Sequence, residues 1–245
     1  MTSSSRLAPY VAPFAVFMAF LGIVDGSCPN EHYLLYPVKS LLVVAVIAWY
    51  WRDLPSLKPV AILGSVAVGI VGLVLWVGME PASNWLADTM SVFWNQVVGA
   101  VGWTSGAVKM DSQHAPGLDP FALYPAAEAW ALFACRAAGI ALVVPVMEEL
   151  FWRGFLMRWL IRDDFTTVPL GTYQPLSFWV TTFFFASVHG VEWPQGLVVG
   201  VIYGAWFVRT KSLGSIMLAH GVTNLLLAFY CLATGQWHFL ATLPK

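Results

Sequence analysis

Long apolar runs recur along almost the whole chain, and they limit its fold more than any other feature of the sequence. They are bounded by charged or turn-forming residues, as membrane spans are. Of the 245 residues, 59% are hydrophobic and 10% are charged, and the mean hydropathy is +0.72. A soluble globular domain needs far less apolar surface. The sequence therefore predicts an all-α, polytopic membrane helix bundle with about seven transmembrane helices, over 9–24, 38–51, 59–78, a long run that ends near 161, 175–189, 194–208 and 213–233.

Basic residues are distributed unevenly between the two ends of these runs. With seven spans, most Lys and Arg fall on one side, and most Asp and Glu fall on the other. Because cytoplasmic loops carry the excess of Lys and Arg, we expect the N-terminus in the cytoplasm and the C-terminus outside. The net charge of −1 and the lack of a basic stripe argue against a nucleic-acid partner. The predicted cytoplasmic side holds Arg6, Arg52, Lys58, Arg158, Arg162, Arg209 and Lys211.

The segment 79–123 is the only long connection between the predicted spans. Its apolar residues recur at roughly helical spacing, which predicts an amphipathic helix. Such a helix can lie on the outer membrane surface or pack as a small helix over the bundle, and the sequence favours neither. The residues that give the pattern are Trp85, Leu86, Met90, Phe93, Trp94, Val97 and Val98, with Trp103 following.

Two adjacent carboxylates and an arginine interrupt the longest apolar run. A charge at the centre of a bilayer costs a few kcal/mol, so such residues usually face a protein interior and carry function. On a helix, Glu149 and Arg153 are four residues apart and share a face, where they can form an ion pair. Glu148 points about 100° away from that face. We therefore expect Glu149 to be neutralised by Arg153, and Glu148 to have no local partner.

Two further polar clusters lie at a similar depth in other helices. His189 ends the fifth run, and His220 and Asn224 share a face within the seventh. At the helical rise per residue, Glu148 and His220 lie about 15 Å from the cytoplasmic boundary, and His189 and Asn224 about 20 Å. Each of these residues alone is more often an interhelical hydrogen-bonding group than a catalyst. Together, at one depth, they indicate a functional polar site inside the membrane.

This set of residues is suited to activating water. An ionised Glu148, assisted by His189, can take a proton from a water that attacks a carbonyl carbon. His220 and Asn224 can donate hydrogen bonds to the oxyanion that develops. The sequence contains neither GxSxG nor HExxH, and no cysteine lies beside these residues. Glu148, His189 and His220 are also ligand types found in catalytic zinc sites, so the residues alone leave a zinc enzyme open.

The three clusters resemble the motifs of a known family. This is the CAAX-protease and bacteriocin-processing (Abi) family of intramembrane proteases, which includes the type II CAAX prenyl endopeptidases. Its motifs are EExxxR, FxxxH and HxxxN, and they occur here in the expected order. The resemblance covers roughly residues 123–235. The motifs read Glu148-Glu149 through Arg153, Phe185 through His189, and His220 through Asn224.

The resemblance implies a role for each motif residue and a glutamate-type protease that needs no metal or other cofactor. It also implies a protein or peptide substrate in or at the lipid bilayer, and a division of the chain into three parts. Residues 1–122 would form N-terminal helices and the amphipathic segment, 123–235 the protease core, and 236–245 a C-terminal tail. The implied catalytic residues are Glu148, His189, His220 and Asn224, and the implied supporting ion pair is Glu149 with Arg153.

A narrower resemblance concerns the segments 144–153, 156–161 and 233–237. They are similar to a bacterial subgroup, the CAAX prenyl protease-related proteins, which occurs alongside exosortase and protein-sorting systems. This similarity implies a location in the bacterial inner membrane. It also implies that the substrate is the C-terminal sorting segment or membrane anchor of an exported protein.

Two other classes of function use similar residues. A non-catalytic immunity or assembly factor could bind a partner through the same polar core, although an intact motif set argues against a degenerate relative. A proton or ion translocator would need titratable groups across the whole thickness of the membrane. The sequence shows a single cluster, so the protease is the favoured hypothesis.

Overall fold

The computed structural model describes residues 3–21, 32–100 and 117–240, and in these residues it is built of helices without a strand. The main helices are α1 (Ser3–Phe20), α2 (His32–Trp49), α3 (Ile62–Gly78), α4 (Glu80–Ala100), α9 (Pro175–Ser187), α10 (Trp193–Thr210) and α11 (Leu213–Thr234). A further helix, Ala126–Trp159, is 34 residues long. It comprises α6 (Ala126–Ala138), a π segment (Gly139–Val143), α7 (Val144–Glu149), a second π segment (Leu150–Leu156) and α8 (Met157–Trp159). The short helix α5 (Pro120–Leu123) precedes it.

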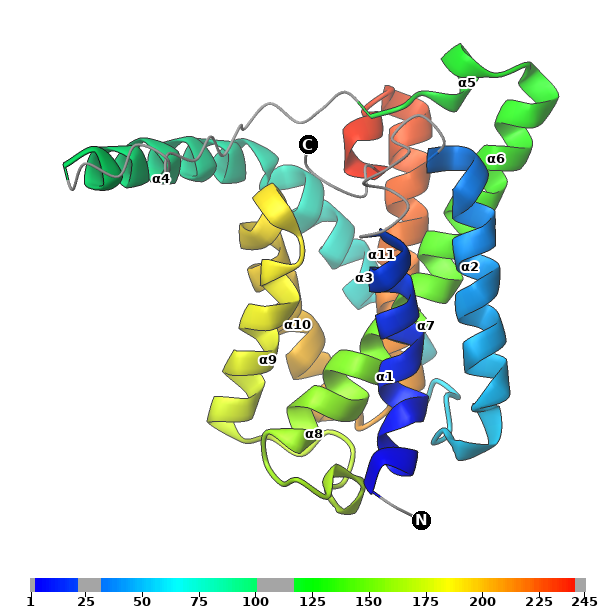
Figure 1. The fold of residues 1–245 in the computed structure, drawn as a ribbon, viewed down its shortest axis with the longest axis vertical. Helices are drawn as coiled ribbons and strands as arrows, with labels where there is room; N and C mark the ends of the chain where they lie inside the picture. Colours follow the sequence, from blue (N-terminus) through cyan, green and yellow to red (C-terminus); the bar gives the residue numbers. More distant parts are fainter. Residues whose placement is uncertain (1–2, 22–31, 101–116, 241–245) are drawn as a thin grey trace.

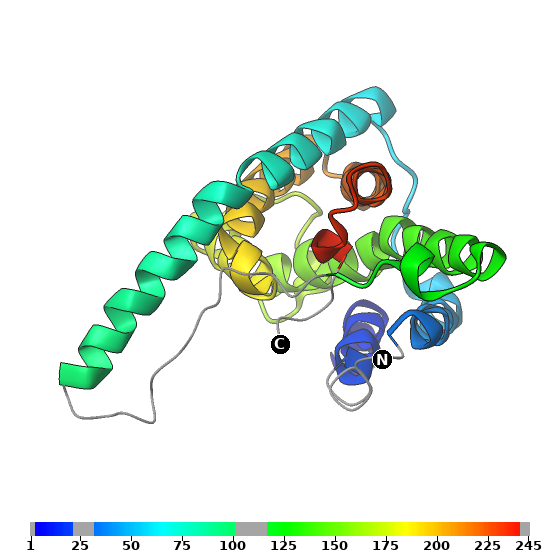
Figure 2. The same cartoon turned by 90° about the horizontal axis from the view of Figure 1, so that it is seen from above.

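Helix α11 is the centre of the bundle (Figures 1 and 2). It packs along α3 on one side and against the middle of the long helix on another, and it also contacts α10. Helices α1 and α2 pair with each other and cover the long helix, while α9 pairs with α10. All three motifs therefore lie on helices that contact α11 directly or through one neighbour.

The first π segment of the long helix has a local cause in the sequence. Pro145 has no backbone N–H, so the carbonyl of Ala141 cannot receive the usual helical hydrogen bond from it. The helix widens just before this point, and the N–H of Val144 bonds to the carbonyl of Gly139 instead. At Gly221 of α11, a Cβ atom would lie only 2.5 Å from the Ala141 oxygen. A glycine is thus required where the α11 backbone meets this carbonyl.

Glycines also determine how closely α9 and α10 approach. Gly196, Gly200 and Gly204 recur every four residues and form one face of α10. A Cβ atom on Gly200 would lie 3.0 Å from the Phe185 ring, and one on Gly204 would lie 2.6 Å from the Phe178 ring. Small residues allow helix backbones to pack closely in membranes. The close packing places Phe185 and the end of α9 against the core of the bundle.

The predicted helical class is confirmed, and the predicted number of spans is not. A helix overlaps each of the seven predicted runs. Within the described residues, however, only Ala126–Trp159 and Leu213–Thr234 are long and apolar enough to cross a membrane alone. A third span results if α3 and α4, which meet at an angle of 49°, are counted as one. Several other helices are shorter than a bilayer requires, for example α9 with 13 residues.

The predicted amphipathic helix is α4, which turns away from α3 and projects sideways from the bundle (Figure 2). Trp85 is 67% exposed and Phe93 is 65% exposed. Exposed apolar side chains of this size suit a helix in contact with lipid, although its position on the membrane surface stays a prediction. Trp103, which extended the sequence pattern, lies outside the described residues.

Candidate active site

The long helix supplies two adjacent glutamates with different surroundings. Glu149 is fully buried, and its Oε1 accepts a hydrogen bond of 3.0 Å from Nη1 of Arg153, which is 1% exposed. This is the ion pair that the spacing of four residues predicts. Glu148 is only half-buried, and its Oε2 has no hydrogen-bond partner among the described residues. Oε2 of Glu149 also has no hydrogen-bond partner among the described residues, so the two carboxylates differ in that only Glu149 is neutralised by a charged partner.

Arg153 is held by two further groups from α9 and α10. Its Nη2 donates to the carbonyl of Gly200 at 3.4 Å. Its guanidinium lies over the ring of Phe185, 4.5 Å from the centroid. These contacts provide the dense partnering that a buried charge requires.

His189 follows α9, and a backbone group orients its imidazole. Nδ1 donates to the carbonyl of Phe185 at 2.7 Å. The ring also contacts Trp76 edge-on, with centroids 5.2 Å apart. In a neutral histidine with the proton on Nδ1, Nε2 carries the lone pair that accepts a proton. Glu148 is close enough to act electrostatically on this imidazole.

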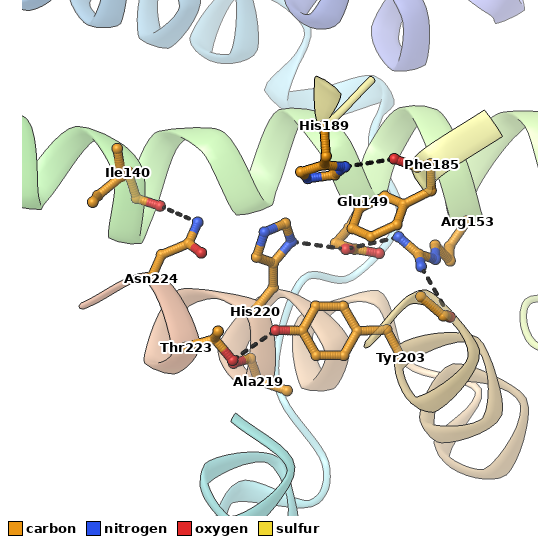
Figure 3. A network of polar contacts seen from close by, with 11 residues as sticks. Ile140, Glu149, Arg153, Phe185, His189, Tyr203, Ala219, His220, Thr223 and Asn224 are labelled. Atoms are coloured by element: carbon orange, nitrogen blue, oxygen red, sulfur yellow. Dashed lines mark hydrogen bonds and ion pairs between the residues drawn. The ribbon is translucent and has the colours of Figure 1, made fainter. Parts of the chain in front are cut away.

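His220 makes a contact that the sequence did not predict. Its Nδ1 donates to Oε1 of Glu149 at 3.0 Å, so this carboxylate oxygen receives both His220 and Arg153 (Figure 3). The two residues are 71 positions apart in the chain, and no local pattern connects them. His220 is 5% exposed and is the most buried of the four predicted catalytic side chains.

Asn224 faces the first π segment of the long helix. Its Nδ2 donates to the carbonyl of Ile140 at 2.8 Å. Asn224 and His220 share a face of α11, as expected, but they bind different partners (Figure 3). The amide nitrogen of Asn224 has two hydrogens, so a second donor remains available after the bond to Ile140.

A residue outside the motifs completes this network. The hydroxyl of Tyr203 on α10 donates to Thr223 Oγ1 at 2.6 Å, and Thr223 donates to the Gly69 carbonyl at 2.7 Å. The rings of Tyr203 and His220 are 5.3 Å apart. Sequence reasoning missed both Tyr203 and Thr223. The only signal for Thr223 was its place beside Asn224, and Tyr203 had none.

The zinc alternative depends on three ligands at one point. Within the described residues, which include all the motif residues, no three His, Cys, Asp or Glu side chains gather in a metal-binding arrangement. Glu148 and His220 both act electrostatically on His189, and Nδ1 of His220 is bonded to Glu149.

The fold and the site define an integral membrane protein with a polar centre inside its apolar helices. Residues 129–226 match the model of the family described as Type II CAAX prenyl endopeptidase Rce1-like. The match contains all the motif residues and agrees with the family predicted from them. This is a family of proteases, which supports a peptidase of the membrane. No curated protein and no solved structure matches the chain significantly.

Proposed function

We propose that the protein is a glutamate-type intramembrane endopeptidase that hydrolyses a peptide bond of a membrane-associated protein. The observation that carries the proposal is the difference between the two adjacent glutamates. Glu149 is fully buried and its Oε1 is bonded to Arg153 and His220, while Glu148 forms no ion pair among the described residues and acts electrostatically on His189. A buried carboxylate without a partner is costly, so its retention indicates a chemical task.

In this proposal Glu148 and His189 activate water together. The free Oε2 of Glu148 accepts a hydrogen bond from a water molecule. His189, whose Nδ1 is committed to Phe185, has Nε2 available as a second acceptor. One of the two groups takes the proton as the water oxygen attacks the carbonyl carbon, and it later passes the proton to the leaving amine.

His220 and Asn224 stabilise the oxyanion that forms in this attack. Asn224 keeps one N–H after its bond to Ile140. His220 donates from Nε2 when both of its nitrogens carry protons, with Nδ1 bonded to Glu149 at 3.0 Å. Donors fixed before the reaction cost no reorganisation when the charge develops.

Glu149 and Arg153 form the supporting ion pair. Glu149 links Arg153 to His220, and Arg153 extends the link to α10 through Gly200. We propose that this group orients His220 and needs no metal or other cofactor.

The substrate and the topology follow from the sequence and its resemblance. We propose that the substrate is the C-terminal sorting segment or anchor of an exported protein in a bacterial inner membrane, with the N-terminus of the protease in the cytoplasm. The last point can be tested in a variant without its native cysteines. A cysteine at the exposed position Ser56 should resist a membrane-impermeant thiol reagent added outside intact cells, and one at exposed Ala127 should react. The reverse pattern would overturn the orientation.

The activity is tested by comparing protein termini in wild-type and Glu148→Gln cells by mass spectrometry of the membrane fraction. We expect at least one membrane protein to keep an uncut terminus in the variant. Glu128→Gln is the matched control, since Glu128 is exposed on the same long helix and lies outside the site. Identical termini in all three strains, with the protein present at equal levels, would argue against a protease and for a binding function.

A further inference from the structure

Tyr203 is the centre of a second layer of contacts behind the motif residues. Its side chain is 1% exposed. Its hydroxyl donates to Thr223 Oγ1 at 2.6 Å, and the Thr223 hydroxyl donates to the carbonyl of Gly69 at 2.7 Å. This chain of two hydrogen bonds joins α10, α11 and α3. Because every polar atom in the chain is buried, breaking it leaves an unsatisfied group.

The ring of Tyr203 is also one of the walls around His220. The two rings are 5.3 Å apart and inclined by 43°. Phe185 contacts the same imidazole edge-on, with centroids 6.2 Å apart. The imidazole is thus bonded at Nδ1 to Glu149 and packed between residues of α9 and α10 (Figure 3).

Two glycines of α3 make room for this arrangement. A Cβ atom on Gly72 would lie 2.6 Å from Thr223 Oγ1 and 3.2 Å from the Tyr203 hydroxyl oxygen. A Cβ atom on Gly69 would lie 2.6 Å from the Ala219 oxygen, directly before His220 in α11. The backbone of α3 is therefore in close contact with the segment of α11 that carries His220.

We propose that Tyr203 is a positioning residue for His220. The bond from His220 to Glu149 fixes one nitrogen but leaves the ring free to swing about it. The Tyr203 ring, anchored through Thr223 to α3, removes this freedom and holds Nε2 in one orientation. The inference deepens the proposed function and rests on it, because a fixed Nε2 is what an oxyanion donor requires.

The test uses Tyr203→Phe, Thr223→Val, the double variant and Tyr203→Leu, each purified in lipid nanodiscs. One measurement is kcat and KM on the substrate found by the comparison of termini. The other is the ¹⁵N spectrum of protein labelled at histidine, with the His220 signals assigned through His220→Gln. Tyr36→Phe is the control, since Tyr36 is also a buried tyrosine but lies on α2.

We expect Tyr203→Phe and Thr223→Val each to lower kcat about 5–10-fold, the effect of losing one neutral hydrogen bond, with KM almost unchanged. The double variant should be no worse than either single one, because both break the same chain. Tyr203→Leu should lower kcat about 100-fold, as misplaced catalytic groups do. In its spectrum, the single set of ring-nitrogen signals from His220 should give way to a mixture. Tyr36→Phe should leave kcat and the His220 signals unchanged.

A purely structural Tyr203 gives a different result. Thermal stability would then fall while kcat and the His220 signals stayed as in the wild type, and this would overturn the proposal. Fully additive losses in the double variant would also contradict it. If Tyr203→Leu does not fold, the kcat values and His220 signals of Tyr203→Phe and Thr223→Val test the proposal. If the wild-type protein cleaves nothing, the proposed function fails, and the His220 signals alone support or refute the role of Tyr203.

Discussion

The site contains two regions that differ in whether their carboxylate has a charged partner. In the inner region, Glu149, Arg153 and His220 are at most 5% exposed, and they are connected by hydrogen bonds. In the outer region, Glu148 and His189 are half-buried, and Glu148 Oε2 has no partner among the described residues. Buried charges persist in an apolar environment only when they are paired, whereas a group that acts on substrate must keep an atom free. The comparison separates the ion pair that supports the site from the carboxylate that we propose activates water, and His220 connects the two because its Nδ1 is bonded to Glu149 while its Nε2 is the proposed oxyanion donor.

The largest effect should come from the outer region. Glu148→Gln keeps the shape of the side chain and removes the base, so turnover should fall below detection while the thermal melting temperature stays near that of the wild type. Activity and thermal melting of the same preparation check this. A large loss of stability would mean that Glu148 belongs with the inner region.

The corresponding change in the inner region should lower the stability of the protein, which Glu148→Gln should leave unchanged. Glu149→Gln removes the only carboxylate bonded to Arg153 and His220 in the described structure. Removing one member of a buried pair costs about 3–5 kcal/mol, so the yield of folded protein and its thermal stability should fall. Glu148→Gln, one residue away, is the matched control. Equal stability of the two variants would erase the distinction between the regions.

Asn224, which belongs to neither region, tests whether a hydrogen-bond donor stabilises the oxyanion. Asn224→Ala should lower kcat about 10²–10³-fold, the usual effect of losing one such donor, with little change in KM. Activity should also survive exhaustive chelation. An almost normal Asn224→Ala enzyme, together with a chelated enzyme that zinc restores, would replace the metal-free mechanism by a zinc mechanism.

The smallest expected effect concerns the helix contact beneath both regions. Gly221→Ala would place a Cβ atom 2.5 Å from the Ala141 oxygen, and overpacking of this kind costs about 1–3 kcal/mol. Gly78→Ala is the control, because its Cβ would meet no atom within 4 Å. Thermal unfolding in one detergent compares the two. A stable Gly221→Ala variant would show that α11 can move away from the long helix without harm.

The sequence predicted those features of the fold and the site that depend on the spacing of residues along the chain. The positions of the helices follow from the apolar runs, and the Glu149–Arg153 contact follows from helical periodicity. The shared depth of the motifs predicted that they would meet, but not which atoms would bond. The pairing of His220 with Glu149 spans 71 positions and depends on how α11 packs against the long helix.

Other contacts depend on departures from ideal geometry. Asn224 binds the Ile140 carbonyl in a π segment, and regular helical geometry gives no reason to expect an acceptor there. Pro145 was visible as a local cause of that widening, but its consequence for Asn224 depends on the tertiary fold. The number of spans was harder to predict, because apolar runs of 13–18 residues occur both in short spans and in buried helices.

The central place of α11 has a consequence for biosynthesis. A chain leaves the ribosome from its N-terminus, so α11 emerges after the other long helices that the structure describes. Until it inserts, Glu149 lacks His220, Ile140 lacks Asn224, and α3 lacks the neighbour along which it packs. A chain in which α11 has not yet inserted therefore holds Glu148 and His189 without His220 and Asn224, the oxyanion donors that we propose. Under the proposed function, the site is therefore incomplete until α11 has joined the bundle.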